Sequence, residues 1–375
     1  MNCALCNEIL DESFDSREHL ILNAIGGRRK VRGVLCIRCN NTSGAEWDSE
    51  LADQLNPLAL LFGIDRQEGR VPARKFETAG ESQLWLNPDG TMSPAAAPYQ
   101  KIPKDGGGWQ IQVTARTLAD ARKILKGVAA KYPEVDYERV LATAELKADY
   151  LGDALKMSLG IGGARAGRSI VKSGLCLSVS EGVDPMKCAA ARAYLKDDTA
   201  EPCFGFYYAR DLVRDRPRHV PLHCVAVSNC GCDGQLLAYV EFFGFHRMVL
   251  CLAGTYQGPD VHASYAVNPM TGKELALNVE LALPRAEVAA TYAYERIPDG
   301  AYEAILTELI PVAQKLSFER EKDRAILRAF QSAMQGCGVP EGGELPLEKR
   351  WEFSRIMAEQ MTPFVTRHLN RRRGS

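Results

Sequence analysis

The chain has 375 residues, of which 25% are charged and 46% are hydrophobic, and its formal net charge is −1. This charge balance excludes a generally basic nucleic-acid-binding protein, although local basic clusters remain. The sequence has no run of about 18 apolar residues, so it predicts no membrane span, and its length predicts two or three domains.

Two cysteine pairs, Cys3-x-x-Cys6 and Cys36-x-x-Cys39, lie near the start of the chain. A Cys-x-x-Cys turn presents two sulfurs to one ion, and Zn²⁺ binds four thiolates in a tetrahedron. A segment this short buries little apolar surface, so metal binding would contribute to its folding free energy. The first residues lack the basic start and apolar run of a signal peptide. We therefore expect a cytoplasmic protein, in which paired cysteines bind structural zinc rather than form disulfides.

The residues between and after the cysteine pairs predict two strands followed by a helix. Residues 16–27 are typical of a short strand that enters a Gly-Gly turn, and residues 31–36 of the returning strand. Residues 45–55 predict a helix because apolar side chains recur every four positions, at Trp47, Leu51 and Leu55.

This segment also carries an acid, a histidine and two amides. Glu18-His19 lies in the first predicted strand, and Asn40-Asn41 directly follows the second cysteine pair. Carboxylate and amide oxygens suit a hard divalent cation, and an imidazole can take a proton from water. The combination is what metal-dependent phosphodiester hydrolysis requires. Asn40-Asn41 could instead be only a helix N-cap. Asp48 could point back toward the metal, but a position that faces solvent or lies behind the ligands is favoured.

The pattern Cys-x2-Cys, Glu-His, Gly-Gly, Leu-Cys-x2-Cys-Asn-Asn, Gly, Trp-Asp-x-x-Leu resembles the HNH endonucleases over residues 1–60. The resemblance implies a ββα-metal fold in which His19 is the general base that activates water. It further implies that Glu18 binds a catalytic Mg²⁺ or Mn²⁺ and that Asn40 is the second ligand, with Asn41 as the alternative.

Two positions depart from the family pattern. The middle Asn of the HNH motif falls at Val31, which cannot orient the base, so another group or the backbone must substitute. The proline expected after the Glu-His strand is Leu22. Both departures leave the predicted metal and base positions intact.

Basic residues gather beside the predicted site. Between Gly26 and Asn40 the chain has no acid, and its basic residues there are Arg28, Arg29, Lys30, Arg32 and Arg38. We expect these side chains to meet the phosphates of a nucleic acid. A second cluster, residues 367–373, predicts either a DNA-contacting arm or a solvated tail.

The remaining chain predicts an α+β arrangement. Residues 61–108 are expected to form a linker with short strands, within which residues 92–108 are a loop. Residues 109–300 predict an α+β domain, and residues 301–375 predict helices with a break at residues 336–346.

Within the α+β region, Thr117 caps a predicted helix that ends near Tyr132, and residues 138–159 predict a second helix. Residues 160–168 are rich in glycine but lack the Gly-Lys-Ser/Thr ending of a phosphate loop, so we expect a basic loop. The β runs 204–209, 220–228, 236–243 and 247–253 predict an antiparallel meander.

The sequence therefore predicts an α+β protein: an N-terminal ββα-metal module with a four-cysteine zinc, then a larger α+β domain with an antiparallel sheet and C-terminal helices. We expect a metal-dependent DNA endonuclease. Its larger domain would recognise DNA, bind a partner protein or sense a ligand, and defence against phage is an expectation by analogy. One such site cuts one strand, so double-strand cleavage would require a homodimer or sequential nicks. The alternatives are a zinc-containing nucleic-acid- or protein-binding module without catalysis, and an RNA-directed toxin.

Overall fold

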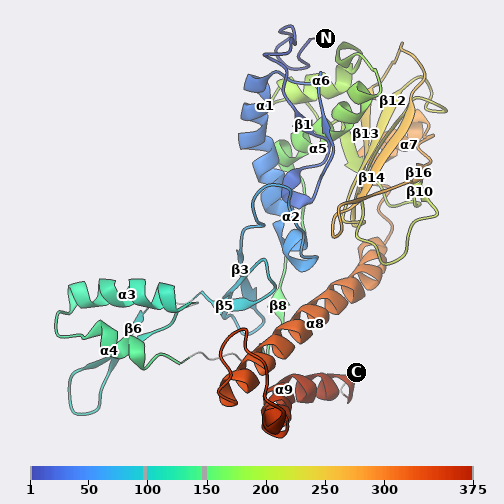
Figure 1. Cartoon of the computed structure of the whole chain (residues 1–375). Helices are drawn as coiled ribbons and strands as arrows, with labels where there is room; N and C mark the ends of the chain where they lie inside the picture. The colour runs from blue at the N-terminus through green and yellow to red at the C-terminus, as the bar shows by residue number, and fades with distance from the viewer. Residues whose placement is uncertain (1, 96–98, 116, 146–149, 374–375) are drawn as a thin grey trace. The chain divides into compact units, whose positions relative to one another are not determined.

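The computed structural model describes residues 2–95, 99–115, 117–145 and 150–373. The chain folds as two compact units, Met1–Ile305 and Leu306–Ser375. The first unit holds the cysteine pairs and the antiparallel sheet, and the second holds most of the C-terminal helices (Figure 1). The domain limits drawn from the sequence stay a prediction.

The N-terminal module has the predicted order of two strands and a helix. Strand β1 (Glu18–His19) pairs antiparallel with β2 (Lys30–Val31), with Glu18 opposite Val31 and His19 opposite Lys30. The Gly-Gly turn between the strands is closely packed, since a Cβ on Gly27 would lie 1.7 Å from the carbonyl oxygen of Ile21. Helix α1 (Ile37–Ser43) continues through a π-helical turn (Gly44–Asp48) into α2 (Ser49–Leu61).

The elements from β3 to β8, which we call the excursion, lie in the sequence between this module and the larger sheet. It contains a sheet with strand order β5-β4-β3-β8 and a hairpin of β6 and β7, followed by α3 and α4. The elements are β3 (Arg74–Thr78), β4 (Gln83–Leu86), β5 (Met92–Pro94), β6 (Tyr99–Pro103), β7 (Trp109–Val113), α3 (Leu118–Lys131), α4 (Tyr137–Ala142) and β8 (Leu155–Lys156). Thr117 caps α3 by accepting a hydrogen bond from the backbone N–H of Asp120, as predicted.

Two predictions for this excursion were wrong. The loop predicted over 92–108 is interrupted by β5 and β6, while its residues 96–98 lie outside the described part of the chain. Pro94 sits on the edge strand β5, where a missing N–H is tolerated. The helix predicted over 138–159 ends at Ala142, and residues 155–156 instead pair with β3 as strand β8. Tertiary pairing prevails there over local helix propensity, while residues 146–149 of the prediction lie outside the described residues.

The largest sheet is antiparallel, with strand order β15-β14-β11-β12-β13-β9. Its strands are β9 (Phe204–Phe206), β11 (His223–Ser228), β12 (Leu236–Phe242), β13 (His246–Ala253), β14 (His262–Asn268) and β15 (Lys273–Leu275). The consecutive pairing of β11, β12 and β13 confirms the predicted meander for its last three runs. The first run was wrongly placed, because β9 pairs with β13 and not with β11. Strands β11 and β12 are buried along their whole length, which requires cover on both faces.

Helix α5 (Gly163–Ser180) covers one face of this sheet, with α6 (Ala189–Lys196) beside it. A Cβ on Gly174 would lie 3.0 Å from that of Ala238, so the helix approaches β12 closely. On its other side α5 packs against α2 and the π-helical turn, so it lies between the sheet and the N-terminal module (Figure 1). The loop predicted over 160–168 is wrong for residues 163–168, because these residues belong to α5. Just before the helix, the side-chain amide of Gln54 in α2 makes two hydrogen bonds to the backbone of Gly162.

The opposite face of the sheet is covered by α7 (Arg285–Tyr292) and by the pair β10 (Val213–Arg214) and β16 (Asn278–Val279). Their apolar side chains pack in one core with Cys224 and Ala226 of β11 and with Leu237 and Tyr239 of β12. The sheet is thus the middle layer of three, and polar groups within it must find partners in the protein.

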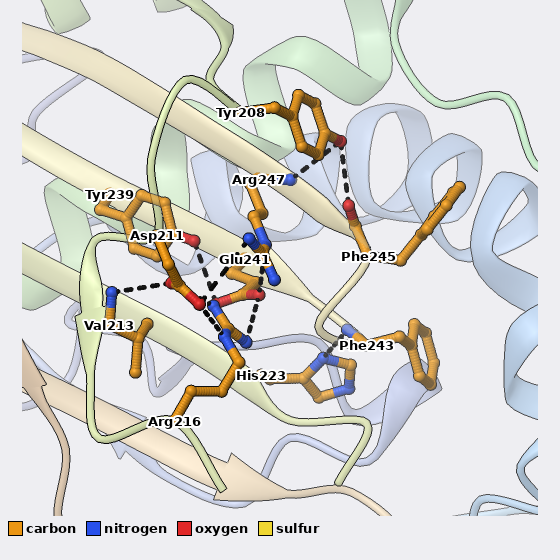
Figure 2. Close-up of polar contacts among 10 residues, drawn as sticks. All are labelled: Tyr208, Asp211, Val213, Arg216, His223, Tyr239, Glu241, Phe243, Phe245 and Arg247. Atoms are coloured by element: carbon orange, nitrogen blue, oxygen red, sulfur yellow. Dashed lines mark hydrogen bonds and ion pairs between the residues drawn. The ribbon is translucent and has the colours of Figure 1, made fainter. Parts of the chain in front are cut away.

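A cluster of buried charges on this sheet meets that requirement (Figure 2). The carboxylate of Glu241, which is 0% exposed, accepts from Arg216 at 2.8 Å, from Arg247 at 3.2 Å and from the Tyr239 hydroxyl at 3.0 Å. Arg216 also donates to Asp211 at 2.5 Å, which fixes the loop after β9 onto β12. Each charge is paired, which offsets the cost of removing it from water.

His223 links the sheet to the N-terminal module. Its Nδ1 accepts from the backbone N–H of Phe243 at 3.0 Å, as Figure 2 shows, and its Nε2 lies 2.8 Å from the carbonyl oxygen of Ile25. These partners require a neutral imidazole with the proton on Nε2. Burial accordingly lowers the pKa of His223 to about 4.

The second unit is a pair of long helices, α8 (Ala301–Gly336, which begins in the first unit) and α9 (Arg350–Arg373). Aromatic pairs join them, with ring centroids 5.7 Å apart for both Phe318–Phe364 and Phe330–Phe353. The predicted helical tail and its break are confirmed. None of the helices in the described ranges combines the length and hydrophobicity of a membrane span.

Glu241→Ala is expected to lower the free energy of unfolding by about 3–5 kcal/mol, because it removes the buried carboxylate that two guanidinium groups share and leaves Asp211 as their remaining acidic partner. Glu280→Ala, which removes the partially exposed Arg214–Glu280 pair, is the matched control and should cost about 0–1 kcal/mol. Urea unfolding followed by circular dichroism measures both. Equal effects would show that the buried cluster contributes no more than a surface pair.

Acid is expected to destabilise the first unit through His223. The unfolded chain binds a proton with a pKa near 6.5 and the folded chain only near 4, so stability is full above about pH 6.5 and falls as the pH decreases toward 4. The slope should be about 1.4 kcal/mol per pH unit from this residue. His223→Gln should remove this part of the pH dependence and leave the part that comes from His246. Burial lowers the pKa of His246 to about 3. Unchanged pH slopes in urea unfolding of the variant would contradict this role.

Candidate active site

The four N-terminal cysteines converge in the structure. Their sulfur atoms all lie within 4.8 Å of one another, and Cys6 Sγ is 3.7 Å from Cys36 Sγ. A tetrahedral zinc ion with bonds of about 2.3 Å places its sulfurs about 3.8 Å apart, so the cluster fits structural zinc. In the part of the chain that the structure describes, no other group of three or more His, Cys, Asp or Glu side chains is close enough together to hold one metal ion.

Local backbone contacts set this geometry. Cys36 is the N-cap of α1, where its sulfur accepts from the backbone N–H of Cys39 at 3.4 Å, and the Cys36 N–H in turn points to Cys3 Sγ at 3.4 Å. Burial alone would raise the pKa of Cys6, but the Glu8 backbone N–H and the neighbouring thiols lower it to about 7. The N-cap of α1 is thus a cysteine, and the interpretation of Asn40-Asn41 as the cap was wrong.

The hairpin of β1 and β2 places Glu18 and His19 on one short strand. Glu18 is 4% exposed, and its Oε2 has no hydrogen-bond partner among the described residues. His19 is half-buried, and its Nε2 is likewise left without a partner in the described chain. Burial, together with the charge of Lys30, lowers the pKa of His19, so the imidazole is neutral near pH 7 and can accept a proton.

The other oxygen of Glu18 meets a cation from the sheet domain. Lys172 of α5 is 1% exposed, and its Nζ lies 3.2 Å from Glu18 Oε1 and 2.5 Å from Asp48 Oδ2. The second oxygen of Asp48 accepts from the Ser169 hydroxyl at 2.5 Å. Burial alone would lower the pKa of Lys172, but Asp48 and Glu18 more than offset this and raise it, so the side chain stays charged.

Residues 3–56 match the family model of the HNH endonucleases. The resemblance noted over residues 1–60 is therefore confirmed for the N-terminal module, which we call the HNH module. No curated protein and no solved structure matches the chain.

Two of the predicted site residues make no polar contact with Glu18 or His19 that the described residues show. Asn40 and Asn41 lie inside α1, where Asn40 is half-buried and Asn41 exposed, and no polar contact joins either side chain to Glu18 or His19 among the described residues. Val31, at the position of the middle Asn of the HNH motif, is buried opposite Glu18. The ligand roles predicted for Asn40 and Asn41 stay predictions.

The basic residues of the HNH module differ in their surroundings. Arg28 donates to the carbonyl of Asp65 at 2.9 Å, Arg29 lies 3.6 Å from Glu181, and Lys30 lies 3.2 Å from Glu68. Arg32 and Arg38 are exposed. The phosphate contacts predicted for the five residues stay a prediction, and the side chains of residues 370–373 in the C-terminal cluster lie outside the described part.

Sequence reasoning missed Lys172 and Ser169, and for Asp48 it left open a position facing solvent, one behind the ligands and one toward the metal. Asp48 does not face solvent, because its carboxylate bonds to both of those side chains. One signal for Lys172 was available: it is the sole charged residue from Ser169 to Ser180, a stretch of apolar and small residues. A lysine in such a stretch has to be paired when the helix is buried.

Cys36→Ser is expected to lower the zinc content from about one ion per chain to near zero, because a tetrahedral site loses one of its ligands. Cys230→Ser, at an exposed cysteine outside the cluster, is the matched control and should keep the ion. Elemental analysis of purified protein gives the ratio. Zinc retained in full by Cys36→Ser would contradict the four-thiolate site.

Proposed function

We propose that the HNH module hydrolyses phosphodiester bonds of DNA, with His19 as the general base. The proposal rests chiefly on His19, a neutral imidazole whose buried Nε2 is without a partner in the described residues and which stands next to an acid on the hairpin. In this role His19 takes a proton from water, and the resulting hydroxide attacks the phosphorus. The family match of residues 3–56 supports a nuclease.

The catalytic divalent cation that the family implies does not fit the site in this arrangement. Glu18 offers one buried oxygen without a partner in the described chain, but its other oxygen and the Asp48 carboxylate already face the Lys172 ammonium. Two cations this close would repel each other strongly.

We propose that DNA approaches along the basic surface of the module, where the exposed side chains of Arg32 and Arg38 are available to phosphates. Structural zinc at the four cysteines would fix the position of α1 relative to β1. The larger domain is proposed as the element that controls cleavage, since α5 contributes Lys172 directly to the site. A part in phage defence and a homodimer for double-strand cleavage are proposals carried by the family resemblance alone.

The rival is a zinc-containing module that binds nucleic acid or protein without catalysis. The observation in its favour is the Lys172 ammonium between Glu18 and Asp48, which satisfies charges that a nuclease would keep for its metal. The two proposals differ at His19, because a binding module has no cleavage to lose.

His19→Ala is expected to reduce cleavage of supercoiled plasmid about 100-fold or more, the usual contribution of a general base. Purified protein is compared with Mg²⁺, Mn²⁺ or EDTA, and zinc content and circular dichroism confirm that the fold is kept. His262→Ala, an exposed histidine of β14, is the matched control and should cut normally.

Plasmid binding without cleavage by the unaltered protein, under every metal condition, would favour the binding module. An RNA substrate in parallel separates a DNA nuclease from an RNA-directed toxin, because only RNA offers a 2′-hydroxyl as internal nucleophile.

A further inference from the structure

A lysine of helix α5, which belongs to the domain of the antiparallel sheet, lies buried against two acids of the HNH module. Lys172 is fully enclosed, and it stands on α5, far along the chain from the residues that it bonds. Its helix is fixed on one side by the sheet, where Gly174 allows close contact with Ala238 and Leu250. The position of the ammonium is thus set by the larger domain and not by the HNH module itself.

The two carboxylates around Lys172 converge on one point. Nζ lies 2.5 Å from Asp48 Oδ2 and 3.2 Å from Glu18 Oε1, and Ser169 orients Asp48 by binding its other oxygen. A buried carboxylate and a half-buried one that face each other repel unless a cation stands between them. The site is therefore built around a cation, and in this structure the protein supplies it.

One positive charge does not balance the site. Glu18 and Asp48 together carry two negative charges, while Lys172 carries one, and Glu18 Oε2 is buried with no partner in the described chain. A divalent cation would match both carboxylates and could use the free oxygen, since Mg²⁺ and Mn²⁺ favour carboxylate ligands. Lys172 and such a cation cannot occupy the point together.

We propose that Glu18 and Asp48 form a divalent-cation site and that Lys172 is its resident competitor, which holds the HNH module in a metal-free resting state. Cation binding then requires the Lys172 side chain to leave the space between the carboxylates. Because α5 belongs to the sheet domain, any displacement of that helix releases the site. This inference rests on the proposed nuclease function for its purpose, but the cation exchange itself is a binding property.

The test replaces the ammonium and measures Mn²⁺ binding rather than cleavage. Lys172→Met keeps an unbranched side chain one atom shorter and removes its charge. Isothermal titration of the zinc-loaded full chain with Mn²⁺ should show a site at least about tenfold tighter in Lys172→Met than in the unaltered protein. Adding Asp48→Asn to Lys172→Met should abolish the gain. Lys196→Met, at an exposed lysine of α6, is the matched control and should bind Mn²⁺ as the unaltered protein does.

Thermal unfolding keeps the test decisive if Lys172→Met is unstable. Without the ammonium, Glu18 and Asp48 have no positive charge to balance them, so Mn²⁺ should raise the melting temperature of Lys172→Met and leave that of the Lys172→Met/Asp48→Asn double variant unchanged. Equal Mn²⁺ affinity in Lys172→Met and the unaltered protein, or no Mn²⁺ effect on its melting, would overturn the inference. Neither result depends on cleavage, so failure here leaves the plasmid assay of His19 as a separate test of the nuclease.

Discussion

The buried ammonium group of Lys172 is the constraint that fixes the HNH module against the sheet domain. Helix α5 packs against the antiparallel sheet on one side and against the HNH module on the other, so Lys172 has no access to water. An isolated ammonium there would be too costly, and Glu18 and Asp48 are the groups that make it tolerable. The position of the HNH hairpin and the position of the sheet domain are therefore coupled through this side chain. His223, which contacts Ile25, adds a second polar link between the same two parts.

The HNH module was largely predictable because its signals are local. Cysteine spacing, the Glu-His strand and the Gly-Gly turn fix ligands and strand ends within a few residues of each other, and the structure gathers the four thiols as expected. The meander was predictable for a similar reason: its β runs alternate with turns at regular spacing, and consecutive strands pair. Buried sheet strands of this kind leave a clear hydrophobic pattern in the sequence.

The rest of the candidate site could not be predicted in the same way because it is assembled over long separations. The sequence left open whether Asp48 faces solvent, the ligands or the metal, and what it faces is decided by α5, whose Lys172 lies far along the chain. The helix predicted over 138–159 failed for a related reason, since residues 155–156 pair with β3 in preference to their local tendency. Pairing across such distances leaves little trace in a single sequence, apart from an isolated charge in an apolar helix.

The contact between Gln54 and Gly162 bears on how this chain tolerates change. The side chain of Gln54 binds both the N–H and the carbonyl of Gly162, so the excursion that carries β3 to β8 leaves and returns at nearly the same point. Closing a longer or shorter loop between fixed ends changes its entropy only slowly with length. Insertions, deletions or a foreign domain could accumulate between these ends without shifting Asp48 relative to Lys172. The excursion is thus the part of this protein most free to diverge among descendants that keep the same core.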